Sequence, residues 1–120
     1  MLAVQVWNSI HRTTHPFAER LAKSRYIRDK YPDRLPIIVD TTGTLPKLDK
    51  HKFLVPCDLT VSQLMYVVRK RMSLRPEVAM FMYVGTVMLQ GGATITEVYH
   101  EAKDEDGFLY LLAAGENTFG

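Results

Sequence analysis

The sequence predicts a single domain of the α+β class. Short apolar runs rich in β-branched residues have the length of strands, and they alternate with amphipathic segments that carry helix-capping residues. The composition, 47% hydrophobic and 23% charged, is that of a folded globular protein, and 120 residues are enough for one core. No apolar run approaches the roughly 20 residues that a membrane span requires. The single cysteine, Cys57, cannot form an internal disulfide, which predicts a reducing compartment such as the cytosol.

Two helices are expected before the first strand. Residues 2–12 place apolar side chains on roughly one helical face. These are Leu2, Val6, Trp7 and Ile10. Residues 15–32 predict a clearer helix, because Pro16 suits a first turn and Pro32 ends the segment. Three apolar residues should line the inner side of this second helix: Phe17, Leu21 and Ile27.

Four strands are predicted from short runs of β-branched and aromatic residues. The runs at residues 35–40 and 50–56 flank a loop, so they should form a hairpin with a connection longer than a tight turn. A third, buried strand is expected at residues 79–84. The last strand is expected at residues 108–114, after an acidic turn.

Two further helices each begin with a capping box, in which two side chains satisfy orphan backbone N–H groups reciprocally. Thr60 pairs with Gln63 at the start of the segment 58–72, and Thr94 pairs with Glu97 before the last strand. The first of these helices ends in basic residues, which the helix dipole favours there.

The order of these elements is that of a β-grasp, a ubiquitin-like four-stranded mixed sheet, here with two additional N-terminal helices. We therefore expect one domain in which residues 1–32 form a helical extension, 33–114 the β-grasp core and 115–120 a flexible tail. A split ferredoxin-like arrangement is the alternative that the order leaves open.

The sequence holds no pattern typical of an enzyme or a metal site. Cys57 has no catalytic signature around it, and the neighbouring Asp58 would oppose thiolate formation. The four histidines lack the spacing of metal ligands, and Gly91 and Gly92 predict a turn rather than a phosphate loop. We therefore predict a protein that is not an enzyme and carries no metal or cofactor.

Basic residues are concentrated at residues 20–34. Two interpretations fit: a solvated helix face, or a surface for an acidic peptide, lipid headgroup or RNA. The net charge of +2 is too small to argue for nucleic acid, so none is expected as a partner.

The predicted second strand has alternating faces, with Lys52 and Leu54 on one and Phe53 and Val55 on the other. If this strand lies at an edge of the sheet, its lysines can serve to discourage aggregation. Lysines beside apolar pockets also suit the addition of an acidic-flanked peptide as a further strand. Spacing alone leaves both interpretations open.

Several blocks of the sequence resemble the autophagy-related protein 8 family, the GABARAP-type ubiquitin-like modifiers. In chain order they are HPF, KYPDRLPIIV, LDKHKFLVPCDLTVSQ, VRKRM, LRPE, EDGFLY and GENTFG. The resemblance runs from about His15 to Gly120 without a large gap. It implies a ubiquitin-like β-grasp preceded by two helices, in agreement with the order of elements.

The resemblance also implies a function. An activating and a conjugating enzyme join members of that family, through a C-terminal glycine, to phosphatidylethanolamine on autophagosomal membranes. A cysteine protease trims precursors and later removes the lipid. Gly120 matches the conjugated glycine, and Phe119 before it would be gripped as an anchor. The protein would be cytoplasmic until lipidation places it on the autophagosome membrane.

Family members recruit receptors that present an aromatic-x-x-aliphatic motif, often beside acidic residues. The resemblance assigns residues of this sequence to three parts of the receptor site. The aromatic pocket would comprise Ile27, Pro36, Ile38, Lys52, Leu54 and Phe108. The aliphatic pocket would comprise Phe53, Val55, Pro56, Leu59, Leu64 and Val67, although Leu64 and Val67 suit a core role equally well. Acidic flanks would meet Arg34, Lys50 and Arg71.

The sequence departs from the family at several places. Lys23 stands where GABARAP-type proteins have an acidic residue, and Gly91 and Gly92 stand where prolines are usual. The N-terminus, with Trp7, is longer. These changes bear on the choice of partner.

An alternative to lipid conjugation stays open. The protein would then be conjugated to another protein, or would act as an adaptor without conjugation.

Overall fold

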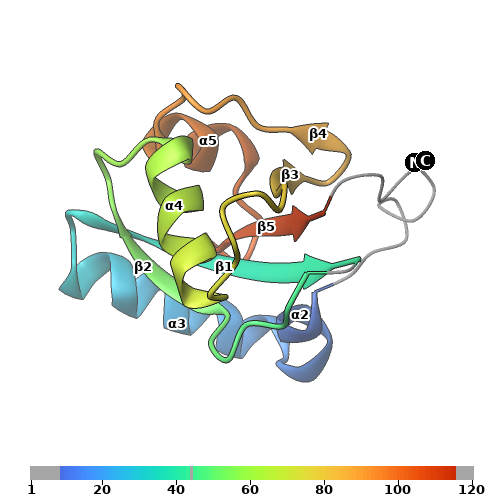
Figure 1. Ribbon diagram of the computed structural model, residues 1–120. Helices are drawn as coiled ribbons and strands as arrows, with labels where there is room; N and C mark the ends of the chain where they lie inside the picture. Colours follow the sequence, from blue (N-terminus) through green and yellow to red (C-terminus); the bar gives the residue numbers. More distant parts are fainter. Residues whose placement is uncertain (1–8, 44, 116–120) are drawn as a thin grey trace.

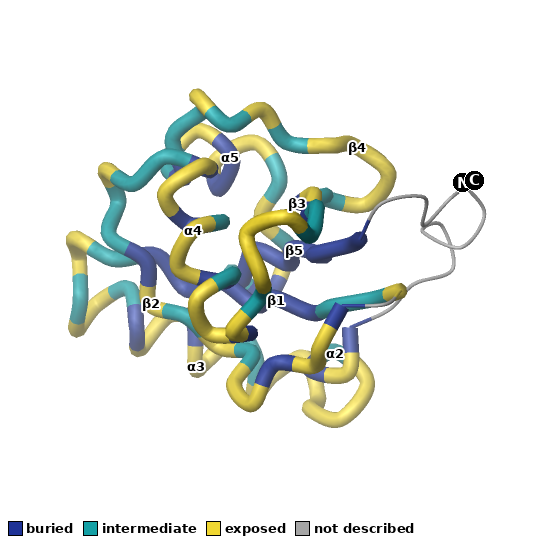
Figure 2. The backbone as a smooth tube through the Cα atoms, in the orientation of Figure 1, coloured by how far each residue is buried: buried dark blue, intermediate teal, exposed yellow. Residues whose placement is uncertain are grey.

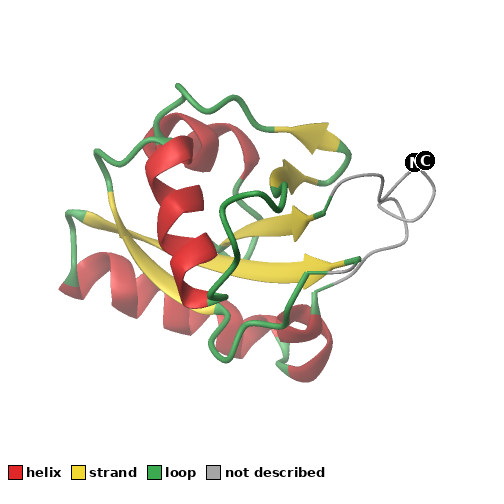
Figure 3. Cartoon of the chain, in the orientation of Figure 1, coloured by secondary structure: helices red, strands yellow, loops and turns green. Residues whose placement is uncertain are grey.

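The computed structural model describes residues 9–43 and 45–115, which form four helices and five strands (Figures 1 and 3). The helices are α2 (Ile10–Thr14), α3 (Phe17–Lys30), α4 (Val61–Arg71) and α5 (Ile95–Ala102). The strands are β1 (Arg34–Thr42), β2 (Lys52–Pro56), β3 (Phe81–Val84), β4 (Val87–Met88) and β5 (Leu109–Ala114).

The strands form one mixed sheet in the order β2-β1-β5-β3-β4. β1 and β5 lie parallel in the interior of the sheet, and the other neighbours are antiparallel. β1 and β2 form the predicted hairpin, with Ile38 opposite Lys52. The arrangement is therefore ubiquitin-like and not the split ferredoxin-like alternative.

The predicted number of four strands is wrong by one, because β4 was not expected. Its two residues, Val87 and Met88, pair with Val84 and Tyr83 of β3 and are both exposed. Two exposed residues are too few to show the alternation that identifies a strand. The turn between the two strands holds Gly85 at a φ of +57°, a backbone region that glycine adopts without strain.

β3 is less buried than the sequence suggested. Met82 is buried in the core, but Phe81 is 36% exposed, and Tyr83 and Val84 are half-buried. On the side of β3 away from β5, its only neighbour among the described residues is β4, which is two residues long. Part of β3 therefore has no described strand on that side.

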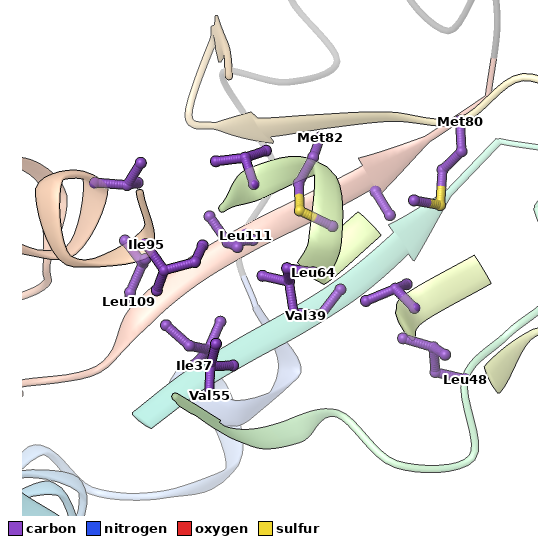
Figure 4. Packing of buried hydrophobic residues seen from close by; sticks show 14 of the residues in the cluster. Ile37, Val39, Leu48, Val55, Leu64, Met80, Met82, Ile95, Leu109 and Leu111 are labelled. Atoms are coloured by element: carbon purple, nitrogen blue, oxygen red, sulfur yellow. The ribbon is translucent and has the colours of Figure 1, made fainter. Parts of the chain in front are cut away.

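Helices lie on both faces of the sheet, with α4 and α5 on one face and α2 and α3 on the other (Figures 1 and 2). Successive residues of a strand point to opposite faces, so β1 contributes to two cores. Ile37 and Val39 belong to the larger core beneath α4, together with Leu64 and Leu111 (Figure 4). The smaller core, on the α3 side, contains Ile27, Ile38, Phe108 and Tyr110.

Both predicted capping boxes are confirmed. Gln63 donates its backbone N–H to Thr60 Oγ1 at 3.2 Å, and Thr60 donates its own N–H to Gln63 Oε1 at 2.9 Å. Thr94 and Glu97 make the equivalent pair at the start of α5. These local signals explain why the starts of α4 and α5 could be predicted.

The expected inner side of α3 is only partly correct. Ile27 is buried and Leu21 is half-buried, but Phe17 is 44% exposed. The buried contact is made instead by Ser24, whose hydroxyl donates to the carbonyl of Asp106 at 2.5 Å. Phe17 lies two turns before Ser24 on the same face of α3. This face is therefore buried at Ser24 and exposed at the start of the helix.

The first helix of the described chain, α2, overlaps only the end of the helix expected at residues 2–12 and extends two residues beyond it. The earlier positions of the expected helix, including Leu2, Val6 and Trp7, lie outside the described residues. None of the helices that the structure describes is long and apolar enough to cross a membrane.

Candidate peptide-binding edge and aromatic cavity

β2 lies at one edge of the sheet, as the interpretation of strand addition requires. It pairs with β1 on one side, and no described strand pairs with its other side. Lys52 and Leu54 are exposed, whereas Val55 is buried and Phe53 is half-buried. The predicted alternation is therefore confirmed. The outer side of β2 has no strand beside it among the described residues, and the carbonyl of Leu54 accepts there from the Arg34 side chain, which a further strand would displace.

A cavity of about 380 Å³ opens beside the start of β2. Its walls come from α2, from β1 and from the segment that leads into β2. The lining residues are Ile10, His11, Thr14, His15, Ile38, Asp40, Lys50, His51 and Lys52. An apolar floor beneath a rim of two lysines is suited to an aromatic group with acidic neighbours.

The residues assigned to the aromatic pocket divide into lining and supporting positions. Ile38 and Lys52 line the cavity, and so does Lys50. Ile27 and Phe108 are buried in the smaller core, where they pack with Ile38 and so lie behind the cavity wall. The two remaining positions are Pro36, which is buried in β1, and Leu54, which is exposed on β2.

The residues assigned to the aliphatic pocket lie on the α4 side of β2. Val55 and Leu64 are buried in the larger core, Leu64 with 1% of its surface exposed. Phe53 and Leu59 are half-buried against that core, and Val67 is 40% exposed on α4. Pro56, at the end of β2, is half-buried. The accessible apolar surface on this side comes from the half-buried and exposed positions.

Of the basic positions, Lys50 and Arg71 are exposed, and Arg34 donates to the carbonyl of Leu54 at 3.3 Å. No carboxylate of a described residue lies within ion-pair distance of Lys50, Lys52 or Arg71. These cations can therefore meet acidic groups of a partner without first breaking an ion pair.

The sequence interpretation missed the side chains that α2 contributes to the cavity. His11 is buried, and its Nδ1 lies 2.9 Å from Tyr110 Oη. Tyr110 donates to Asp106 Oδ2 at 2.5 Å, and Arg20 Nη1 donates to the same oxygen at 2.6 Å. This network ties α2 to α3 and β5. No sequence pattern could reveal it, because His11 and Tyr110 are 99 positions apart.

Burial determines the protonation of this network. Burial raises the pKa of Tyr110, and the bond to Asp106 adds to the rise, so the phenol keeps its proton. Burial, with the nearby charges of Lys52 and His15, lowers the pKa of His11 to about 4. The imidazole in the cavity wall is therefore neutral at pH 7.

A second polar pair, Asp40 and His51, lies on the β1 and β2 side of the cavity. His51 Nδ1 is 3.1 Å from Asp40 Oδ1 and 2.9 Å from the carbonyl oxygen of Val39. Asp40 is buried, and its Oδ2 has no hydrogen-bond partner among the described residues. Asp40 lines the cavity and thus places beside it a buried acceptor that lacks a donor among the described residues.

Other residues singled out in the sequence lie apart from this cavity. Cys57 is half-buried, and its carbonyl oxygen accepts from Thr96 Oγ1 at 2.6 Å. The described part of the chain contains no group of three His, Cys, Asp or Glu placed to hold a metal ion. Lys23 is exposed on α3. Phe119 and Gly120 lie outside the described residues.

Comparisons with known proteins agree with this geometry. The family model described as "Autophagy protein Atg8 ubiquitin like" matches residues 19–120. Autophagy-related protein 8d of Arabidopsis thaliana is 50% identical over 108 residues, covering 88% of this chain and 90% of the relative. Autophagy-related protein 8 of Mycosarcoma maydis is 48% identical over 114 residues, covering 93% of each.

A solved structure is similar in fold as well as in sequence. The crystal structure of Trypanosoma brucei ATG8 has a TM-score of 0.90 and 42% identity, covering 95% of this chain and 100% of that one. The chain therefore belongs to the Atg8 family of ubiquitin-like autophagy proteins.

Proposed function

We propose that this chain is a lipid-conjugated modifier of autophagy whose β2 edge binds receptor peptides by strand addition. The observation that carries the binding proposal is the open edge of β2 beside the cavity, with Lys50 and Lys52 at its rim. A peptide strand would bond to the outer backbone groups of β2, and its acidic flank would meet the two lysines.

The spacing of an aromatic-x-x-aliphatic motif fits this edge. Residues three positions apart in a strand point to opposite sides. An aromatic side chain directed into the cavity on the α2 side would therefore direct the aliphatic one toward α4. There Phe53 and Leu59 are half-buried and Val67 is exposed, so an aliphatic group can bury apolar surface against them.

Charge reversal at the rim tests the binding site. Lys52→Glu should raise the Kd of an acidic-flanked aromatic-x-x-aliphatic peptide by about tenfold at low salt, and by less at high salt because ions screen the exposed charges. Isothermal titration calorimetry measures both values. Lys103→Glu, an exposed lysine after α5, is the matched control and should bind as the wild type does. Equal affinity of the Lys52→Glu variant would contradict the proposed site.

The second part of the proposal is conjugation through Gly120. In an activating enzyme, the Gly120 carboxylate would attack the α-phosphorus of ATP to give an adenylate and release pyrophosphate. A cysteine thiol would then displace AMP to give a thioester. The amine of phosphatidylethanolamine would attack the thioester carbonyl and release the thiol, leaving an amide. The two acyl chains would hold the protein on the autophagosome membrane, since two chains anchor stably.

This assignment implies the partners of the pathway: the activating and conjugating enzymes and a cysteine protease that processes and delipidates the chain. Mass spectrometry of the C-terminal peptide from cells tests it. We expect Gly120 to carry phosphatidylethanolamine. An isopeptide to a protein lysine, or a free carboxylate under conditions that induce autophagy, would instead support the protein modifier or the adaptor.

A further inference from the structure

The hydrogen bonds behind His11 determine its tautomer. Asp106 accepts from Arg20 Nη1 at 2.6 Å, from Tyr110 Oη at 2.5 Å and from the N–H of Phe108 at 2.8 Å, as an ionised carboxylate does. Tyr110 thus gives its only proton to Asp106. Its oxygen must then accept from His11 Nδ1, 2.9 Å away, so the proton of the imidazole is on Nδ1.

A neutral imidazole with its proton on Nδ1 keeps a lone pair on Nε2. Nδ1 points to Tyr110, so Nε2 lies on the ring edge that is turned away from Tyr110, in a side chain that lines the cavity. No described residue donates a hydrogen bond to it. The low pKa of His11 keeps Nε2 an acceptor at pH 7.

Asp40, the buried carboxylate beside the cavity, also has an oxygen without a hydrogen-bond donor among the described residues. Asp40 Oδ1 is 3.1 Å from His51, but Oδ2 has no partner among the described residues. The lysines of the cavity, Lys50 and Lys52, are exposed at its rim. A buried acceptor without a donor costs free energy, so the favoured occupant is one that brings a donor inside.

We propose that His11 makes the cavity select tryptophan, by accepting a hydrogen bond from the indole N–H on Nε2. This rests on the proposed function, because it names the aromatic residue that the β2-edge peptide should carry. Tryptophan combines a large apolar ring with a donor and no acceptor. Phenylalanine brings no donor and would leave Nε2 buried without a partner, and a site built around a hydrogen bond rejects such an analogue.

Two peptides that differ in one atom group test this. Both carry the same acidic flank and aliphatic residue, and one has tryptophan where the other has benzothienylalanine, in which sulfur replaces the ring N–H. We expect the wild-type protein to bind the tryptophan peptide roughly three to ten times more tightly by calorimetry. The ratio should fall to about one in His11→Phe. It should persist in His100→Phe, which changes an exposed histidine on α5, outside the cavity.

A ratio near one in the wild type overturns the proposal. A ratio that persists in His11→Phe but is lost in Asp40→Asn also overturns it, because the acceptor is then Asp40. Failure of both peptides to bind the wild type contradicts the proposed peptide-binding function itself. These results are distinguishable, since the first two require binding of both peptides.

A measurement on the wild type covers the case in which His11→Phe does not fold. The ¹⁵N chemical shift of His11 Nε2 should move on addition of the tryptophan peptide and stay nearly unchanged with the sulfur analogue. Equal shifts with both peptides would show that Nε2 does not accept from the indole and would overturn the proposal.

Discussion

At the scale of single residues, the polar groups behind the cavity depend on contacts distant in sequence. Arg20, Asp106 and Tyr110 come from α3, the turn before β5, and β5 itself. Each is satisfied by the others, which is how buried charged groups are tolerated. Gly107 allows the turn to form, with a φ of +89° that other residues rarely adopt.

The depressed pKa of His11 predicts a pH dependence of stability. The ordinary pKa is 6.5 and the folded value is about 4, so between these values the unfolded chain binds the proton more readily. The contribution is complete above about pH 6.5 and is lost as pH falls through 4. At most, roughly 3 kcal/mol of unfolding free energy is involved.

Urea denaturation of the wild type and His11→Phe between pH 7 and 4 measures this. The wild type should lose more stability than the variant over that range, because carboxylates titrate in both proteins and only the wild type has the buried imidazole. The groups that act on His11 are Lys52, His15, Asp106 and Arg20, and all of them remain in the variant. Parallel pH profiles would contradict the buried, neutral state of His11.

At the scale of elements, local patterns predicted what local interactions determine. The capping boxes at Thr60 and Thr94 involve neighbours three residues apart, so the sequence contains the whole signal. The position of β2 at the sheet edge and the contribution of α2 to the cavity depend on tertiary packing. Alternation in β2 could show two faces, but it could not show that His11 would lie beside Lys52.

The cap of α4 gives a prediction of its own. Thr60→Ala removes the acceptor for the N–H of Gln63 and should lower the free energy of unfolding by about 1 kcal/mol. Thr60→Ser keeps the hydroxyl and is the matched control, expected to change stability by only a few tenths of a kcal/mol. Urea unfolding followed by circular dichroism measures both. Equal losses in the two variants would mean that the capping bond contributes little.

At the scale of the whole molecule, the proposed function separates two tasks. Partner choice would reside in the β2 edge and the cavity. Val55 of β2 packs in the larger core, and Ile38 of the cavity wall packs in the smaller core. Membrane attachment would reside in Gly120, which lies outside the described residues. The resemblance of the sequence blocks was needed to predict both sites, because alternation showed two faces of β2 without placing this strand at an edge, and composition and spacing revealed no conjugation chemistry.

This separation predicts that the two tasks can be lost independently. Gly120→Ala should abolish conjugation to phosphatidylethanolamine. Alanine has a Cβ on the Cα next to the reacting carbonyl carbon, and this Cβ crowds the approach of the thiol and the amine. Glycine lacks it and is the least hindered acyl donor. Peptide affinity and the unfolding midpoint should stay at wild-type values. Reconstituted lipidation with the activating and conjugating enzymes, ATP and phosphatidylethanolamine vesicles measures conjugation, and calorimetry measures peptide affinity.

Thr118→Ala, which keeps Phe119 and Gly120, is the control and should be lipidated. Normal lipidation of Gly120→Ala would remove Gly120 from the proposed role, while a parallel loss of peptide binding would show that the two sites are not independent.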